Sequence, residues 1–206
     1  GFCDVSTLGK IDIQGKDALD FVNKVYCNGF AKLPVGKVRY GLMLREDGIV
    51  MDDGTTARMS ENHFIMTTTT INAESVYRHL EFCHQCLWPE MDVHLISTTD
   101  AWAQIAIAGP NSRKIVSKIV DKQFDVSNEN FPFMACKEIT ICGGVLARLF
   151  RISFSGELAY ELSVPTQYAS SLASYLMEIG KEENIIPYGT EALGVMRIEK
   201  GHAAGA

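Results

Sequence analysis

The sequence has few cysteines and prolines, and it lacks long apolar runs and linker-like stretches. Its 206 residues include six cysteines and six prolines, and no low-complexity or linker-like stretch separates one part from another. No apolar run reaches the roughly 18–20 residues that a membrane-spanning helix needs. The first residues carry neither a basic region nor an apolar signal core. We therefore expect a soluble, cytoplasmic protein built as one domain or as two closely joined lobes.

The charge pattern excludes one class of partner. The net charge is -6 and the 19 Lys and Arg residues are scattered, whereas a nucleic-acid surface requires clustered basic residues. The sequence also has no phosphate-binding glycine-rich loop, no GxSxG elbow and no HExxH motif. Its five histidines are isolated along the chain, which favours structural roles for them.

Cys83 and Cys86 are the cysteine pair with a suggestive spacing. Structural zinc would need a second pair of ligands, and none has the right spacing. Cys83 also continues an apolar helical stripe with Val76 and Leu80. Two cysteines three residues apart on a regular helix usually lie too far apart to bridge. We expect free core or surface thiols, with a redox pair and a metal site as the alternatives.

An internal echo indicates a duplicated architecture. The segment Ile13–Gly15 precedes a predicted helix, and about 94 residues later Ile107–Gly109 does the same. Each half then continues with a hairpin, a strand and a second helix. The pattern predicts an α+β fold with two pseudo-symmetric halves, at residues 1–100 and 101–206. A chance echo within an α+β chain is the alternative.

Turn and capping residues mark the ends of several elements. Arg45–Gly48 and Cys142–Gly144 each separate two apolar runs, as hairpin turns do. Asn72 is placed to cap a helix at its start. Gly201 is placed to end a helix that carries Leu193.

Two acidic segments are the candidates for chemistry. Asp52 and Asp53 end an apolar hairpin strand, and neighbours on a strand point to opposite faces, so one of them is expected in a core or cavity. Glu161 enters a strand after the turn Ser155–Glu157. A partly buried carboxylate there can accept two parallel hydrogen bonds from an amidine-like N–H pair, as pterins and guanines present. The alternatives are solvated turn acids and an edge-strand glutamate that faces solvent.

Taken in order, several segments resemble the glycine-cleavage T-protein (aminomethyltransferase) superfamily over nearly the whole chain. These segments are Phe2–Gly9, Gly48–Asp53, Ala108–Pro110, Phe154–Glu161 and Arg197–Glu199. Within that family, further segments are similar to the sarcosine oxidase alpha subunit. They are Asp4–Lys10, Arg39–Met43, Glu61–Thr70, Phe150–Glu157 and Pro187–Glu191. Each segment alone is weak evidence for the superfamily, whereas the five superfamily segments in order are strong evidence.

The resemblance implies a tetrahydrofolate site. Asp53 matches the family's key carboxylate and is the expected catalytic residue, while Glu161 matches the acid that holds the pterin edge. The other positions carried over as cofactor-binding are Tyr40, Met66, Thr68, Phe154 and Arg197. No metal site is expected. Leu193 stands where the family often has Arg, and Phe154 lacks the hydroxyl of the usual Tyr. Asp53 and Glu161 are expected to come from corresponding regions of the two halves.

The resemblance further implies a function. The chain would be the tetrahydrofolate-binding part of a sarcosine oxidase alpha subunit, an oxidoreductase, without the family's C-terminal β-barrel. It would capture the iminium or formaldehyde unit from amine oxidation as 5,10-methylenetetrahydrofolate. FAD or FMN and NAD would be bound elsewhere in the holoenzyme. The expected partners are the remaining alpha subunit and other sarcosine oxidase subunits, with no nucleic acid and no membrane, and the chain is expected to be a fragment.

Three alternatives remain. One is an aminomethyltransferase of another kind, either T-protein or dimethylglycine dehydrogenase-like. Another is a non-catalytic folate-binding protein of the same fold; its iron–sulfur branch carries Lys-Gly-Cys-Tyr, whereas His202 and Ala203 follow Lys200–Gly201 here. The last is a structural lobe of a large oxidase, which direct folate binding would exclude.

Overall fold

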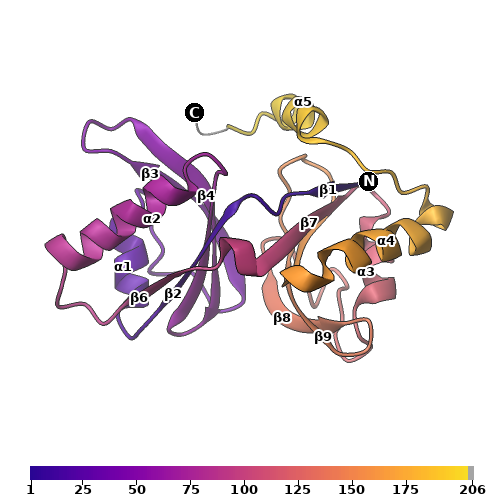
Figure 1. The fold of residues 1–206 in the computed structure, drawn as a ribbon, viewed down its shortest axis with the longest axis horizontal. Helices are drawn as coiled ribbons and strands as arrows, with labels where there is room; N and C mark the ends of the chain where they lie inside the picture. Colours follow the sequence, from indigo (N-terminus) through magenta and orange to yellow (C-terminus); the bar gives the residue numbers. More distant parts are fainter. Residues whose placement is uncertain (204–206) are drawn as a thin grey trace. The chain divides into compact units, whose positions relative to one another are not determined.

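A computed structural model describes residues 1–203 and divides into two compact units. One unit is Thr7–Thr99, and the other combines Gly1–Ser6 with Asp100–Ala203. Each unit has its own five-stranded antiparallel sheet with helices beside it (Figure 1). The predicted α+β class is confirmed. Residues 204–206 of the predicted second half lie outside the described residues.

The Thr7–Thr99 unit has the strand order β3-β4-β5-β2-β6. Its elements are β2 (Gly9–Gln14), α1 (Ala18–Val25), β3 (Lys37–Leu44), β4 (Val50–Ser60), β5 (His63–Thr68), α2 (Ala73–Phe82) and β6 (His94–Ser97). A π-helix, Cys83–Leu87, continues α2. Helices α1 and α2 each have an apolar stripe. Both stripes pack against the same face of the sheet and form one hydrophobic core with it.

The second unit has the strand order β1-β7-β10-β9-β8. Its elements are β1 (Phe2–Asp4), β7 (Trp102–Ala108), α3 (Ser112–Ile119), β8 (Cys136–Ile141), β9 (Val145–Phe150), β10 (Ala159–Pro165), α4 (Ala169–Ile179) and α5 (Thr190–Lys200). Short 3-10 turns occur at Thr99–Ala101, Thr166–Tyr168 and Lys181–Glu183. The edge strand β1 pairs with β7, so the first residues belong to this sheet.

The two sheets share one topology, as the internal echo predicts. In each unit a strand (β2 or β7) leads into a helix (α1 or α3), then a hairpin, a strand (β5 or β10) and a second helix (α2 or α4). Gly15 and Gly109 stand at the two strand–helix junctions with φ of 137° and 120°, a conformation that favours glycine. At Gly15 a Cβ would also lie 2.0 Å from the carbonyl oxygen of Asp92. The echo therefore reflects a repeated structural unit.

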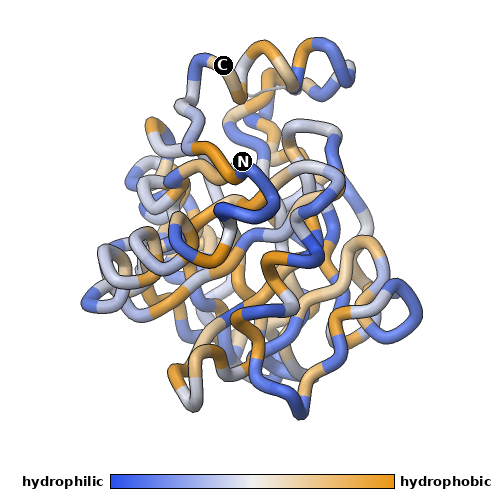
Figure 2. The backbone as a smooth tube through the Cα atoms, turned by 90° about the vertical axis from the view of Figure 1, so that its right-hand side faces the viewer, coloured by the Kyte–Doolittle hydropathy of each residue, from blue (hydrophilic) through white to orange (hydrophobic). Residues whose placement is uncertain are grey.

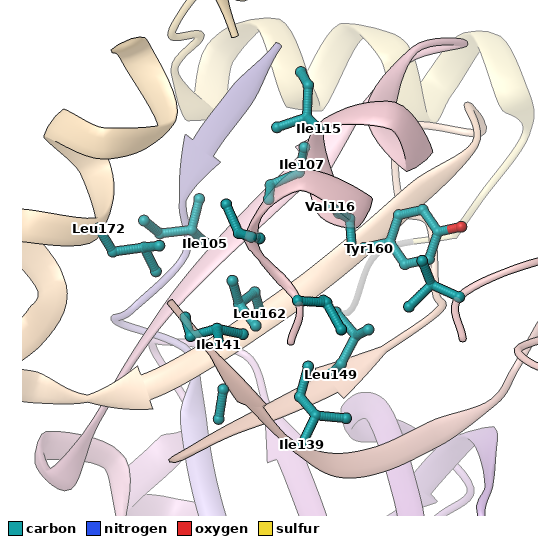
Figure 3. Packing of buried hydrophobic residues seen from close by; sticks show 14 of the residues in the cluster. Ile105, Ile107, Ile115, Val116, Ile139, Ile141, Leu149, Tyr160, Leu162 and Leu172 are labelled. Atoms are coloured by element: carbon teal, nitrogen blue, oxygen red, sulfur yellow. The ribbon is translucent and has the colours of Figure 1, made fainter. Parts of the chain in front are cut away.

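The core of the second unit is built from alternate residues of its strands and from helices α3 and α4. Figure 3 shows Ile105 and Ile107 of β7, Leu149 of β9 and Tyr160 of β10 pointing into this core. Tyr160 is fully buried, and its hydroxyl oxygen accepts a hydrogen bond from Nε of Arg113 at 2.8 Å. Each large apolar side chain buried in this way stabilises the fold by about 1.5–3 kcal/mol.

Hydrophobic residues occur along the chain in short segments between hydrophilic ones (Figure 2). Within residues 1–203, no helix is long and apolar enough to span a membrane.

Most of the local predictions hold. Arg45–Gly48 connects β3 to β4, and Cys142–Gly144 connects β8 to β9, as hairpin turns. Gly201 ends α5 with a φ of 81°. Asn72 does precede α2, but its side chain makes no capping hydrogen bond. The Asn72 amide instead donates to the carbonyl oxygen of Met51, at 3.1 Å.

Candidate functional site

Asp52 and Asp53 are neighbours on β4 that point to opposite faces of the sheet. Asp52 lies opposite Met43 on the face covered by α1 and α2, and Asp53 lies opposite Leu42 on the other face. Both carboxylates are buried, with exposed fractions of 3% and 9%. The expectation that at least one is withdrawn from water is confirmed for both. The two acids therefore have different surroundings and need separate accounts.

Asp52 has a structural set of partners. One carboxylate oxygen accepts from the Thr69 hydroxyl at 2.6 Å and from the Asn72 amide at 3.2 Å, and the other accepts from the Thr69 backbone N–H at 3.1 Å. These bonds join β4 to the turn that connects β5 to α2. Hydrogen bonds to a charged group in a buried place are among the stronger ones. Asp52 thus fixes the end of the strand that carries Asp53.

Asp53 faces the side of the sheet that α1 and α2 do not cover. Its Oδ2 accepts a hydrogen bond from the Tyr40 hydroxyl at 2.8 Å. Burial, followed by this hydrogen bond and the charge of Asp53, raises the pKa of Tyr40 well above its usual range. Tyr40 therefore remains a neutral donor that orients the Asp53 carboxylate. Tyr40 is 38% exposed, so this pair can be reached by another molecule.

Thr55 and Thr67 extend the Asp53 face, and the sequence did not single them out. Thr55 lies opposite Tyr40, and its hydroxyl is 2.9 Å from that of Thr67 on β5. Met66 and Thr68 were predicted to line the pocket, but both lie on the helix-covered face and are buried there. The structure therefore does not bring these two residues together with Asp53. The run Met66–Thr70 is polar on both faces, so its alternation could not indicate which threonine faces Asp53.

In the second unit, Glu161 lies on the face of the sheet opposite the hydrophobic core. Its neighbours in β10, Tyr160 and Leu162, point into that core. Glu161 accepts a hydrogen bond from the side-chain amide of Gln104 on β7. The amide oxygen of Gln104 in turn accepts from the Ser163 hydroxyl at 3.2 Å. Gln104 and Ser163 are 1% and 2% exposed, so the orientation of Glu161 is set by buried partners.

A second group continues this polar face across the sheet. Arg148 on β9 lies 4.1 Å from the ring centroid of Trp102, and its Nε is 3.4 Å from Glu138 on β8. A guanidinium over an indole ring is a favourable cation–π arrangement. Gln104 is the one polar residue of the otherwise apolar strand β7, and this pattern is a signal in the sequence that could have pointed to it. The polar face thus includes both signs of charge around Glu161.

Tyr188 is a further titratable group near Glu161. Burial raises the pKa of Tyr188 to about 12, and the nearby Cys3 and Glu161 contribute in the same direction. Its backbone N–H donates to the carbonyl oxygen of Phe2 on β1 at 2.9 Å. The phenol is therefore held neutral beside this polar face.

Phe154 and Arg197 form a separate cluster near the end of α5. The Phe154 ring stacks on the imidazole of His202 with 6.2 Å between centroids. Nδ1 of His202 donates to the Phe154 carbonyl oxygen at 3.1 Å, because a carbonyl can only accept. Arg197 donates to the carbonyl oxygen of His202 at 3.2 Å. The hydrogen bonds and ring contacts seen for Phe154 and Arg197 thus join them to each other through His202.

Asp53 and Glu161 are not topological equivalents, contrary to the expectation from pseudo-symmetry. Asp53 lies on β4, which corresponds to β9 of the other unit, whereas Glu161 lies on β10, which corresponds to β5. Each unit nevertheless contributes one of these two buried or partly buried carboxylates, on the face that its own helices leave uncovered. Such carboxylates can accept hydrogen bonds from N–H groups and can stabilise a positive charge.

The cysteines of the described residues are all free, with Cys83 buried and Cys86 exposed on the π-helix. Sγ of Cys83 is 3.5 Å from Nε2 of His79. Burial raises the pKa of the Cys83 thiol, which disfavours the reactive thiolate. In the part of the chain that the structure describes, no group of three or more His, Cys, Asp or Glu side chains could hold a metal ion.

The sequence is similar to two groups of curated proteins. It is 63% identical to the sarcosine oxidase subunit alpha of Rhizobium meliloti (strain 1021), over 98% of this chain and 20% of that subunit. It is 47% identical to the corresponding subunit of Corynebacterium sp. (strain U-96), over 98% of this chain and 21% of that subunit. With the aminomethyltransferase of Geobacillus sp. (strain WCH70) the identity is 32%, over 97% of this chain and 52% of that enzyme. The chain therefore spans about a fifth to a half of these relatives.

Two solved structures share the fold. Aminomethyltransferase T of the glycine cleavage system from Bartonella henselae superposes with a TM-score of 0.83 at 23% identity, covering 98% of this chain and 51% of that one. A chain of the heterotetrameric sarcosine oxidase from Corynebacterium sp. U-96 superposes with a TM-score of 0.68 at 10% identity, covering 90% and 85%.

The family model called GCVT N-terminal domain matches residues 1–205. The chain thus belongs to the aminomethyltransferase (GCVT N-terminal domain) family, as the order of its segments predicted.

Proposed function

We propose that this chain is the tetrahydrofolate-binding, one-carbon transfer domain of a sarcosine oxidase-type alpha subunit. It would capture the iminium or formaldehyde unit released by amine oxidation as 5,10-methylenetetrahydrofolate. The observation that carries the proposal is the buried Asp53 carboxylate, oriented by Tyr40 on a partly exposed sheet face. The 63% identity to one sarcosine oxidase alpha subunit, against 32% to an aminomethyltransferase, supports the choice within the family.

The donor and acceptor chemistry of Glu161 fits a pterin. An ionised carboxylate offers about four lone-pair positions. The Gln104 amide donates to one oxygen of Glu161, and an ionised carboxylate can accept hydrogen bonds from several donors at once. An amidine-like N–H pair is the complementary group, and its two parallel bonds would fix the orientation of the ring. Glu161 would therefore bind and orient, with Gln104 and Ser163 holding its carboxylate in place.

Asp53 would have an electrostatic role in the transfer. When bound, tetrahydrofolate would supply the nucleophilic nitrogens that accept the one-carbon unit. An anionic Asp53 would stabilise positive charge that develops beside it, an electrostatic role that needs no proton transfer. The hydrogen bond from Tyr40 keeps its carboxylate in one orientation, so little reorganisation is needed during the reaction. Amine oxidation, with its flavin and nicotinamide cofactors, would take place in other parts of the holoenzyme and its partner subunits.

Calorimetric titration with tetrahydrofolate tests the binding part of the proposal. It is best done on the natural gene product, with Glu161→Ala, Glu161→Gln and the control Glu138→Gln on the same sheet face. Each lost hydrogen bond to a charged group costs about 1.5–3 kcal/mol, so Glu161→Ala is expected to weaken binding by at least ~10-fold.

The control should change the affinity by less than about 2-fold, because the Glu138 side chain is half-exposed and solvent screens its pair with the buried Arg148. No folate binding by the wild-type protein would leave a structural lobe as the better account. Folate binding without one-carbon transfer would favour a non-catalytic binding protein of the same fold.

A further inference from the structure

A pocket in the second unit is not used by the proposed function. It is a cavity of about 340 Å³ between the segment that follows β9 and the end of α5. Arg151, Ser153, Lys200 and His202 contribute its polar lining. Neither Asp53 nor Glu161 lines it.

Two residues that line this pocket each have a buried polar atom without a hydrogen-bond partner. Arg151 is 9% exposed, and its Nη1 donates to Asn128 at 2.8 Å and to the carbonyl oxygen of Phe131 at 2.9 Å, but its Nε donates to nothing. The hydroxyl oxygen of Ser153 is also buried without a partner. Leaving such a group unsatisfied costs roughly 1–3 kcal/mol, and more when it is charged. A buried cationic donor without an acceptor points to an acceptor supplied from outside the chain.

Lys200 adds a second positive charge, and the loop is shaped to let it reach the pocket. Gly156 has a φ of 84°, and a Cβ at this position would lie 2.7 Å from Cγ and Cδ of Lys200. Only a residue without a side chain therefore allows the aliphatic part of Lys200 to cross the loop here.

The remaining lining decides which anion fits. Phe133 and Leu158 provide an apolar wall beside the two cationic side chains, and Glu157 is the acidic residue of the pocket. Two permanent positive charges against one negative charge favour an anion. An apolar wall makes no favourable contact with an inorganic oxyanion, whereas it can bury the hydrocarbon part of an organic anion.

We propose that this pocket binds a small organic carboxylate, which accepts hydrogen bonds from Arg151 and Ser153 and pairs with Lys200. The apolar stem of the ligand then lies against Phe133 and Leu158. The test of this inference uses no folate, so its outcome does not depend on whether the proposed function holds.

The test is calorimetric titration of the natural gene product with butyrate and with inorganic phosphate, at constant ionic strength maintained with chloride. Butyrate is expected to bind with a Kd on the order of 1–5 mM and more tightly than phosphate. Lys200→Gln and Ser153→Ala should each weaken butyrate binding by about 3–10-fold. Lys181→Gln, at an exposed lysine outside the pocket, should change it by less than about 2-fold.

Three results would overturn the proposal. The first is no binding heat up to about 50 mM butyrate. The second is a butyrate affinity of Lys200→Gln and Ser153→Ala equal to that of the control Lys181→Gln. The third is phosphate binding as tightly as butyrate. Ser153 and Lys200 are suitable positions because neither takes part in the hydrophobic core. A circular dichroism melt of each variant separates a loss of binding from a loss of folding.

Discussion

The contrast between two adjacent carboxylates gives a sharp prediction about stability. Replacing Asp52 with alanine removes three hydrogen bonds to one buried charge, from the Thr69 N–H, the Thr69 hydroxyl and the Asn72 amide. Each is worth about 1.5–3 kcal/mol, and because they share one acceptor group their sum is not additive. We expect a loss of about 3–5 kcal/mol in the free energy of opening the region formed by β4, β5 and α2.

Hydrogen exchange followed by mass spectrometry measures this locally in the natural gene product. A loss of 3 kcal/mol corresponds to faster exchange by a factor on the order of 100 in the slowest amides of β4, β5 and the first turn of α2. Asp20→Asn is the matched control, because Asp20 is exposed on α1 and its loss should change exchange by less than about 2-fold. Exchange less than about 5-fold faster in Asp52→Ala would refute the structural role given to Asp52.

Three further predictions follow from single features. Gly54→Ala should lower stability by about 1–3 kcal/mol, because its Cβ would lie 2.0 Å from the Thr67 carbonyl oxygen, whereas Gly29→Ala meets no atom within 4 Å; chemical denaturation distinguishes them. The raised pKa of Tyr188, about 12, means that its neutral form stabilises the fold below pH 10 and that this contribution is lost as the pH rises from 10 towards 12; Tyr188→Phe should therefore flatten the alkaline decline in melting temperature, and an unchanged decline would contradict it. Iodoacetamide labelling read by mass spectrometry should modify Cys27, Cys86 and Cys142 well before Cys3, Cys83 and Cys136, because the first three are exposed and the others buried; rapid labelling of Cys136 would be inconsistent with the structure.

Local sequence signals predicted most of the architecture. Glycine turns, apolar spacing and the repeated segments at Gly15 and Gly109 were sufficient to place the helices and hairpins, because each signal acts within a few residues. The pairing of β1 with β7 was not predicted, since it joins residues about 100 positions apart and depends on long-range sheet order. The π-helix at Cys83–Leu87 also has no recognised sequence signal.

The candidate site was predicted less completely than the fold. Asp53 and Glu161 were found because acids within apolar strands are unusual. Tyr40 came from the family resemblance, and its hydrogen bond to Asp53 gives it a physical role. Thr67 was missed in favour of Thr68, because the strand register decides which of two adjacent threonines shares a face with Asp53.

The role of the Gln104 side chain could not have been predicted from its neighbours in sequence. Its hydrogen bonds to Glu161 and Ser163 require the antiparallel pairing of β7 with β10, which brings together residues more than 50 positions apart. The sequence contains the polar residue, but only the register gives it a partner.

The central claim, that the Asp53 carboxylate supports one-carbon transfer, is tested most directly in the oxidising holoenzyme. The measurement is the rate of 5,10-methylenetetrahydrofolate formation during amine oxidation with Asp53→Asn, which keeps the shape and removes the charge, beside Asp20→Asn as control. The account predicts that Asp53→Asn slows methylene transfer by at least ~10-fold while folate affinity changes less, because the charge matters most where a cation develops. Unchanged methylene formation with Asp53→Asn would contradict the account and remove this residue from the mechanism.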